Sequence, residues 1–325
     1  MIKILDLLNK EKGFTLMEIL MAVGVLSILV LMALPQINIF IDQSLYGIQD
    51  LINTNNSLEN KFAKVYKDII KNQFPTNAVF LTGGDEFDIV MQFDNGSKIY
   101  GDIAVDTSDV SLIQLEGGKQ KEGIFYIDKT QLSLLPVDFE NFTVQTFTQE
   151  IKYTMPEFPS PYSDTLTSEN YNGSDITLPE GNYDYIGVEK NGVINVENPT
   201  SDTQIGIRNF DLRQGNIELV NESNNHITFF VEEGLYLDNS AKINPKPENG
   251  NISIVSKGDI YFEGGSSVNG LIYAPYSTVH LTGGSEVEGA VIAEKIVLEG
   301  GSSITYNADY IGTIDNILPF FEIKE

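Results

Sequence analysis

One acidic residue, Glu18, lies inside the most apolar stretch of the chain. This stretch runs from Phe14 to Leu34 and is otherwise almost entirely apolar. A carboxylate one turn inside a lipid-facing helix costs roughly 2 to 3 kcal/mol or more, so it is normally retained for a purpose. A buried carboxylate and a buried ammonium are each costly alone and tolerable as a pair. The expected chemistry of Glu18 is therefore charge pairing with a buried cation.

The stretch from Phe14 to Leu34 has the length of a membrane-spanning helix. At about 1.5 Å per residue it would cover roughly 30 Å, the thickness of the hydrocarbon core. Three lysines precede it, including Lys10 and Lys12, whereas the chain that follows is acidic. Because positive flanks stay in the cytoplasm, we expect a single-pass protein of the cytoplasmic membrane with its larger part outside. No small-residue cleavage site follows Leu34, so a plain uncleaved anchor is one interpretation.

The residues from Lys12 to Glu18, KGFTLME, closely resemble the processing site of type IV prepilins and pseudopilins. In that family a membrane-embedded aspartyl prepilin peptidase cuts after the glycine of a charged leader and methylates the new amino terminus. The resemblance implies that Gly13 ends the leader and that Phe14 becomes the N-methylated first residue. It also implies that Glu18 neutralises the terminal amine of a neighbouring subunit. We favour this interpretation over the plain anchor because glycine, phenylalanine and glutamate rarely meet at this spacing by chance.

The composition excludes several other classes of protein. The chain has 325 residues, a formal net charge of −26, no cysteine, and two histidines, His226 and His280. An acidic surface repels phosphate backbones, so we expect no nucleic-acid partner. Without cysteine there is no disulfide, thiolate metal site or cysteine nucleophile, and two histidines leave little material for a triad or metal site. We expect no cofactor and no metal.

A long helix and then a set of strands are predicted after the apolar stretch. Pro35 would bend or interrupt the helix, and apolar residues from Ile41 to Ile69 recur at the spacing of an amphipathic helix. Between residues 74 and 155, short apolar runs predict strands, with a hairpin at Asn95-Gly96. The order of these elements resembles the β-meander of larger minor pilins, in which a stripe of the helix packs on the sheet.

The last third of the chain contains a repeat. Three copies with a Gly-Gly pair begin at Phe262, Leu281 and Leu298. A period of about twenty residues with glycine corners is typical of a β-solenoid, in which each turn stacks on the next. The pattern resembles a solenoid module of bacterial pilus-assembly and surface proteins, and its spacing is related to that of the bactofilin family. The apolar tail after the last copy is expected to cap the open end.

Two further functions stay open for the repeat region. Long parallel β-helices include polysaccharide lyases and hydrolases, but the acidic residues here form no motif and are more simply explained as a solvated face, so we expect no enzyme. Both histidines are expected to point outward. Tyrosines could form a glycan-binding face if they stack in register, although tyrosine is also an ordinary strand residue. These are Tyr183, Tyr185, Tyr236, Tyr261, Tyr273, Tyr276 and Tyr306.

The sequence therefore predicts an α+β fold, with a long N-terminal helix, a β-meander pilin domain and a C-terminal β-solenoid. The expected divisions are a leader at 1–13, a helix at 14–73 with its transmembrane part at 14–34, a β-rich pilin-like domain at 74–155, a Pro-rich linker at 156–174, the solenoid at 175–312 and a tail or cap at 313–325.

The expected function is that of a minor type IV pilin, which moves from the cytoplasmic membrane to an extracellular filament. Its bulky head favours a tip or initiating position. The alternatives are a pseudopilin of a type II secretion system, a pilin-anchored adhesin, or a polysaccharide-active β-helix protein. Expected partners are the prepilin peptidase, other pilins through the N-terminal helix, the membrane before assembly, and a surface glycan or protein ligand.

Overall fold

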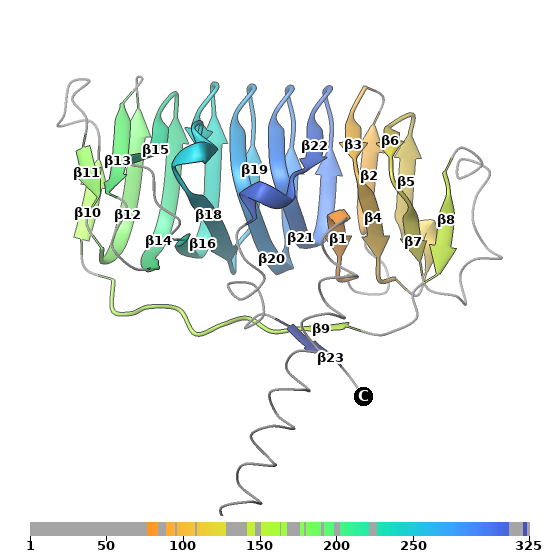
Figure 1. Ribbon diagram of the computed structural model, residues 1–325, viewed down its shortest axis with the longest axis horizontal. Coiled ribbons are helices and arrows are strands. Elements are labelled where there is room, and N and C mark those ends of the chain that lie inside the picture. The colour runs from red at the N-terminus through yellow and green to blue at the C-terminus, as the bar shows by residue number, and fades with distance from the viewer. Residues whose placement is uncertain are drawn as a thin grey trace, which may run out of the picture. The chain divides into compact units, whose positions relative to one another are not determined.

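The computed structural model shows a mostly β protein (Figure 1). Within the described residues 65% are in strands and 5% are helical, and these helical residues form short 3-10 turns, η1 (Val110–Leu112), η5 (Pro247–Asn249) and η6 (Ala308–Tyr310). The structure describes residues 77–83, 89–94, 96–107, 109–127, 142–146, 151–162, 164–167, 176–178, 180–189, 192–197, 202–220, 226–311 and 321–323.

The α+β class expected from the sequence is wrong for this part of the chain, because strands account for nearly all of its regular structure. The expected helix at 14–73 lies outside the described residues. The chain divides into two compact units, Met1–Asp68 and Ile69–Glu325, and every described residue belongs to the second. A search of the described residues found no helix with the length and hydropathy needed to cross a membrane.

The second unit is built on one sheet of 21 strands, which we call the parallel array, because its named strands pair in parallel. Most strands pair with a strand one turn of the chain later, and the strands form three rows. Row A contains β11 (Ile176–Leu178), β13 (Val193–Glu197), β15 (Asn216–Val220), β17 (Lys242–Ile243), β22 (Ser303–Tyr306), β3 (Lys98–Tyr100) and β6 (Lys119–Glu122).

Rows B and C complete each turn. Row B contains β18 (Asn251–Ser256), β1 (Asn77–Leu81), β4 (Asp102–Val105), β7 (Phe125–Ile127) and β8 (Val144–Thr146), and row C contains β10 (Asp164–Thr167), β19 (Ile260–Phe262), β2 (Met91–Asp94) and β5 (Ile113–Glu116). Five longer strands pass through two or three rows: β12 (Asn182–Glu189), β14 (Thr203–Arg213), β16 (His226–Asp238), β20 (Ser267–Leu281) and β21 (Glu286–Leu298).

The array is held together by apolar side chains that stack along its interior. In row C, residues paired from strand to strand are buried at each level, and the same alternation of inward apolar and outward polar residues recurs in the other rows. Stacking of this kind removes apolar area from water at about 25 cal/mol per Å². The row C stack consists of Ile186, Phe210, Leu235, Ile260, Val279, Ile296, Met91 and Ile113.

The Gly-Gly repeats align as their sequences predict. Val268 pairs with Val287, which pairs with Ile304, and all three side chains are buried. Gly270 likewise pairs with Gly289. Similar residues therefore occupy equivalent positions in successive turns.

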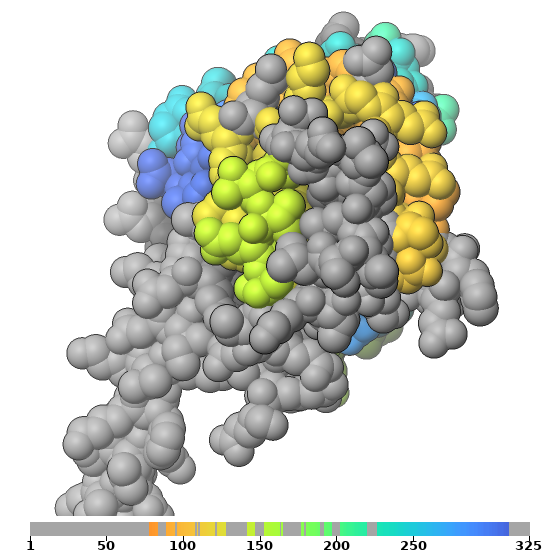
Figure 2. All heavy atoms as spheres, turned by 90° about the vertical axis from the view of Figure 1, so that its right-hand side faces the viewer, coloured from red at the N-terminus to blue at the C-terminus, as the bar shows by residue number. Residues whose placement is uncertain are grey.

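The expected β-meander at 74–155 is wrong. Strands from this region continue the parallel array beyond β21 and β22: Val79 pairs with Val291, Met91 with Ile296, and β3 with β22. The array ends at β8, and Figure 2 views this end, where the yellow-green atoms of β8 lie at the surface. A segment early in the chain thus extends an array that begins later in the chain, at β10.

The hairpin expected at Asn95-Gly96 is wrong as well. The strands on either side, β2 and β3, pair with β21 and β22 instead of with each other. The Ser97 amide donates to the Asp94 carbonyl, as the Ser302 amide does to that of Glu299. Gly96 has a φ of 103°. A tight hairpin and a corner between rows of the parallel array both need positive φ and a short backbone hydrogen bond, so only long-range pairing distinguishes them.

A proline-rich segment runs along the array from β9, near its middle, to the end that carries β10. Residues 154–162, which we call the strap, follow β9 (Ile151–Tyr153) and lead to β10 (Figure 1). The expected linker at 156–174 includes most of it, and its described part packs on the array: the ring of Phe158 meets that of Phe230 edge to face at 5.2 Å. β9 pairs antiparallel with β23 (Phe321–Ile323), which belongs to the expected C-terminal tail.

Candidate functional site

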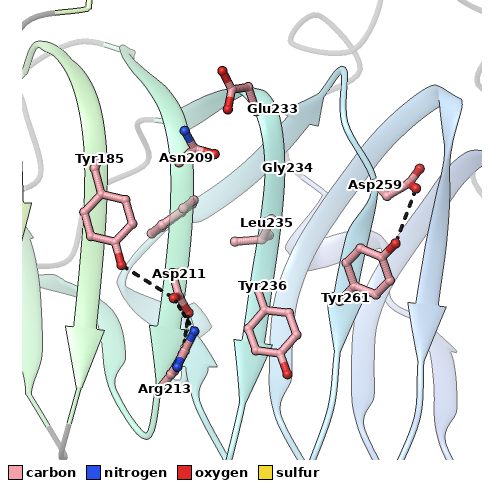
Figure 3. Close-up of a pocket in the computed structure, with 11 residues that line it drawn as sticks. Tyr185, Asn209, Asp211, Arg213, Glu233, Gly234, Leu235, Tyr236, Asp259 and Tyr261 are labelled. Carbon is pink, nitrogen blue, oxygen red and sulfur yellow. Dashed lines mark hydrogen bonds and ion pairs between the residues drawn. The ribbon is translucent and has the colours of Figure 1, made fainter.

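The residues that the sequence assigns to processing and assembly lie outside the described residues. These are Lys10, Lys12, Gly13, Phe14 and Glu18. The described residues carry a different candidate, an open groove of about 580 Å³ on the outer surface of row C (Figure 3). We call it the aromatic groove. It is lined by Tyr185, Asn209, Phe210, Asp211, Arg213, Glu233, Gly234, Leu235, Tyr236, Asp259 and Tyr261.

An irregularity in β16 shapes the groove. Ile207 pairs with Val231 and Asn209 with Gly234, so β16 has one residue more than β14 over this interval. The extra residue makes a β-bulge, a feature that redirects side chains and is common beside functional sites. Gly234 has no side chain where Asn209, its partner in the register, has one, and a Cβ at Gly234 would lie 2.9 Å from the Asp259 carbonyl oxygen. The glycine therefore leaves the groove open at this level.

The rings of Tyr236 and Tyr261, from neighbouring turns, form one wall of the groove, and the ring of His280 lies behind that of Tyr261, outside the groove lining. Tyr236 pairs with Tyr261, and Tyr261 with His280, so all three residues share one outward position of row C. The ring centroids of Tyr236 and Tyr261 are 6.4 Å apart. The rings of Tyr261 and His280 are 4.6 Å apart and inclined by only 7°. The Arg213 guanidinium lies 5.9 Å from the Tyr236 centroid, within the range of a cation–π contact.

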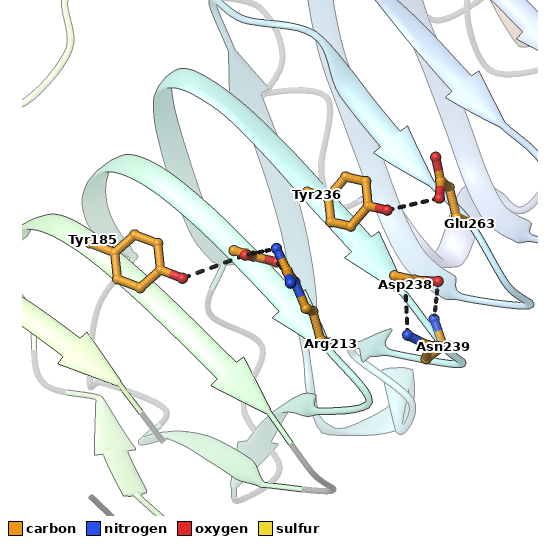
Figure 4. A network of polar contacts seen from close by, with 7 residues as sticks. Tyr185, Arg213, Tyr236, Asp238, Asn239 and Glu263 are labelled. Atoms are coloured by element: carbon orange, nitrogen blue, oxygen red, sulfur yellow. Dashed lines mark hydrogen bonds and ion pairs between the residues drawn. The ribbon is translucent and has the colours of Figure 1, made fainter. Parts of the chain in front are cut away.

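Hydrogen bonds and ion pairs fix the polar groups of this wall (Figure 4). The Tyr185 hydroxyl donates to Asp211 at 3.5 Å, and Asp211 also pairs with Arg213 at 3.0 Å. The Tyr236 hydroxyl donates to Glu263 at 2.8 Å. This hydrogen bond, with burial second, raises the pKa of Tyr236 to about 12. The phenol therefore stays protonated at physiological pH.

The Tyr261 and His280 rings are uncharged at neutral pH. Burial raises the pKa of the Tyr261 phenol, and the nearby Asp259 carboxylate acts in the same direction. Burial lowers the pKa of His280, although the carboxylates of Asp259, Glu299 and Glu263 oppose that shift. The stacked pair is therefore neutral, and one face of each ring is covered by the other.

Two polar side chains of the groove have no partner within the described residues. The half-buried Asn209 amide and the exposed Glu233 carboxylate line the groove and make no hydrogen bond or ion pair there. Figure 3 shows both at the same side of the groove, above Asp211 and Leu235. An amide both donates and accepts hydrogen bonds, and a carboxylate accepts them.

The remaining tyrosines considered from the sequence do not share this surface. Tyr183 is buried. Tyr273 and Tyr276 donate to backbone carbonyls at Thr154 and Tyr153, so they hold the strap region. Tyr306 belongs to row A.

The two histidines occupy different environments. His280 is half-exposed and points outward, as expected. The prediction for His226 is wrong, because its side chain is 3% exposed and its Nε2 lies 2.7 Å from the Ser253 hydroxyl oxygen. Burial lowers the pKa of His226 to about 4, although Asp202 opposes the shift. Across the described ranges there is also no cluster of three or more histidine or acidic side chains suited to hold a metal ion.

The sequence predicts part of the groove, because Tyr236 and Tyr261 are among the tyrosines that could stack in register, whereas His280 is not. Tyr236, Tyr261 and His280 follow one another at intervals close to one turn of the array, which is the spacing of residues that stack in register. Asn209, Glu233 and Asp259 carry no comparable signal, because the bulge that brings them together shows only in the strand register.

Two known protein families match parts of the chain. The prokaryotic N-terminal methylation motif matches residues 8–34, which include all five residues assigned to processing and assembly. This match supports a type IV pilin-like prepilin. A second family, described as a domain of unknown function (DUF7305), matches residues 145–312, more than half of the chain, and the protein belongs to this family. No curated protein sequence matches the chain significantly.

The family match follows the array only in part. It begins in β8 and includes the strap and the strands from β10 to β22. The strands β1 to β7, which complete the array beyond β22, precede the matched region in the chain.

Proposed function

We propose that this protein is a minor subunit of a type IV filament or of the related secretion pseudopilus. The methylation motif at residues 8–34 is the observation that carries the proposal. Prepilin peptidase cuts after Gly13 and methylates Phe14. Glu18 then pairs with the terminal amine of a neighbouring subunit, where each buried charge compensates the other.

We further propose that the parallel array is a β-solenoid head displayed outside the cell. The register supports this idea, since strands one turn apart pair in parallel along the array. The composition also agrees with export as a soluble head, because the chain has a net charge of −26 and needs no disulfide. The bulk of the head favours a tip or initiating position over repetition along a packed shaft.

Display of a binding surface is the second candidate function, and the aromatic groove favours it. A pilin-anchored adhesin needs an exposed recognition site, and the groove combines aromatic faces with polar side chains that have no partner in the described part of the chain. The head acts by binding and not by turnover in this proposal. Release of reducing sugar from polysaccharides by the purified protein would contradict it.

The assembly role can be tested on filaments sheared from cells. The wild-type chain is expected in the filament fraction, and immunogold labelling is expected at one end of each filament. Glu18→Ala should be processed normally but be absent from filaments, whereas the nearby Thr15→Ala should assemble as the wild type does. Labelling along the whole shaft would contradict the tip position, and assembly of Glu18→Ala at the wild-type level would contradict the role of Glu18.

A further inference from the structure

We propose that the aromatic groove is a binding site for an uncharged glycan chain. The proposal rests on the second candidate function, display of a binding surface, and names the class of ligand that this surface takes. Failure of glycan binding would leave the processing and assembly experiments unaffected.

The first argument is the arrangement of the rings. Tyr236 and Tyr261 line the groove from adjacent turns, and the Tyr261 ring stacks on the His280 ring at 4.6 Å, which covers one face of Tyr261 and fixes the orientation of its ring. Tyr261 is 36% exposed, although a large ring on a strand is more often covered. A flat aromatic surface of this kind suits the apolar face of a pyranose ring, which buries its C–H groups against π-electrons.

The second argument is the set of polar groups beside the rings. Sugar hydroxyls both donate and accept, so they require side chains of both kinds. Asn209 and Glu233 provide them, and neither is engaged within the described residues. The β-bulge in β16 brings Glu233 to the groove, and Gly234, the register partner of Asn209, has no side chain there. Ligand pockets typically combine an apolar wall with a few convergent polar groups of this type.

The third argument is charge, which selects among ligands. Asp211, Glu233 and Asp259 line the groove against a single cation, Arg213, so an anionic chain would be repelled. A basic peptide would need several free carboxylates, and of the three in the groove only Glu233 is unpaired within the described residues. Asp211 is already paired with Arg213, and Asp259 accepts from the Thr278 amide at 2.8 Å and from the Tyr261 hydroxyl at 3.4 Å. An uncharged chain that donates hydroxyl hydrogen bonds fits these constraints best.

The test is calorimetric titration of the full chain in a detergent without a sugar headgroup. The probes are three neutral hexasaccharides, cellohexaose, chitohexaose and mannohexaose, with hexagalacturonate as the anionic probe and hexalysine as the cationic one. Saturable binding of at least one neutral hexasaccharide is expected, and no binding of the two charged probes. Absence of binding by all three neutral probes, or tighter binding of hexalysine, would overturn the proposal.

Variants locate the binding to the groove. Tyr261→Ala and Asn209→Ala are each expected to weaken binding about tenfold, which corresponds to about 1.4 kcal/mol. Asn209→Ala is the safer variant for folding, because its amide is unbonded in the described part of the chain. Tyr100→Ala is the matched control, since Tyr100 is a half-buried strand tyrosine in row A, and it should bind as the wild type does. Unchanged affinity in both groove variants, with a wild-type circular dichroism spectrum, would overturn the proposal.

Discussion

The hydroxyl of Tyr273 donates a hydrogen bond of 2.8 Å to the backbone carbonyl of Thr154, 119 residues away in the chain. Tyr273 lies in β20, near the middle of the parallel array, and its side chain is fully buried. Thr154 opens the strap, which leads from β9 to the first strand of the array. The buried hydroxyl of Tyr273 thus fixes the strap to the middle of the array. The strap is the segment that connects the two parts of the array.

Tyr273→Phe should destabilise the fold by about 1 kcal/mol, because it removes one net hydrogen bond and keeps the ring. Urea unfolding of the full chain in detergent measures this change in the free energy of unfolding. Tyr100→Phe is the control, because no hydrogen bond of its hydroxyl is found in the described residues. Equal stabilities of Tyr273→Phe and the wild type would show that the hydrogen bond from Tyr273 to the strap adds nothing to the free energy of unfolding.

Phe158 should anchor the middle of the strap. Its ring packs edge to face on Phe230 at 5.2 Å, and the Lys257 ammonium lies 4.1 Å from its centroid. Phe158→Ala removes an aromatic pair worth about 0.5 to 1.5 kcal/mol beyond burial, so the strap should open more often. Limited proteolysis should cleave this variant faster within the strap, whereas Glu157→Ala, an exposed neighbour, should be cleaved at the wild-type rate. Equal cleavage rates for both would contradict the anchoring role.

Two glycines of the same turn, Gly284 before β21 and Gly289 within it, should differ in their tolerance of a side chain. Gly284 has a φ of 79° but no atom within 4 Å of an added Cβ, so Gly284→Ala should cost about 1 kcal/mol through backbone strain. At Gly289, with a φ of 143°, the same Cβ would overlap the Gly270 carbonyl oxygen, so Gly289→Ala should cost about 3 kcal/mol or more. Thermal unfolding of the two variants gives the comparison. A larger loss in Gly284→Ala would contradict the close stacking of turns.

His226 should make the fold less stable in mild acid. Its pKa in the folded protein is lowered to about 4 from 6.5, so the unfolded chain binds a proton there more readily. Above about pH 6.5 the imidazole of His226 is neutral in both states and costs the fold no stability. As the pH falls toward 4, the free energy of unfolding falls by up to about 3 kcal/mol, because the unfolded chain takes up the proton first. Denaturant unfolding at pH 7 and pH 4.5 measures it, and His226→Gln should lose less stability between the two pH values than the wild type. Identical losses would show that His226 does not titrate in this range.

The repeats could be aligned from the sequence because their copies are similar and near in the chain. Val268, Val287 and Ile304 follow one another at one-turn spacing, and they pair in the structure. The entry of the early strands into the same array was harder to predict, since Val79 pairs with Val291 far along the chain. Such pairing depends on contacts that local patterns do not contain.

A signal for this long-range pairing did exist. The residues from Ile113 to Gly118 read IQLEGG, and those from Ile296 to Gly301 read IVLEGG. Both Ile113 and Ile296 pair with Met91, so the two segments occupy equivalent levels of row C. Considered by itself, the pair Gly117-Gly118 suggests a hairpin loop. Comparison with the segment from Ile296 to Gly301 assigns the pair to a corner of the array instead.

The central claim is that the chain is a processed prepilin, and the mass of its amino terminus tests that claim most directly. The protein is isolated from membranes of cells with and without prepilin peptidase, alongside a Gly13→Val variant, and its intact mass is measured. Processing predicts loss of residues 1–13 and gain of one methyl group on Phe14 in cells with the peptidase, and the full unmethylated chain in the other two samples. The same full-length mass in all three samples would contradict the account.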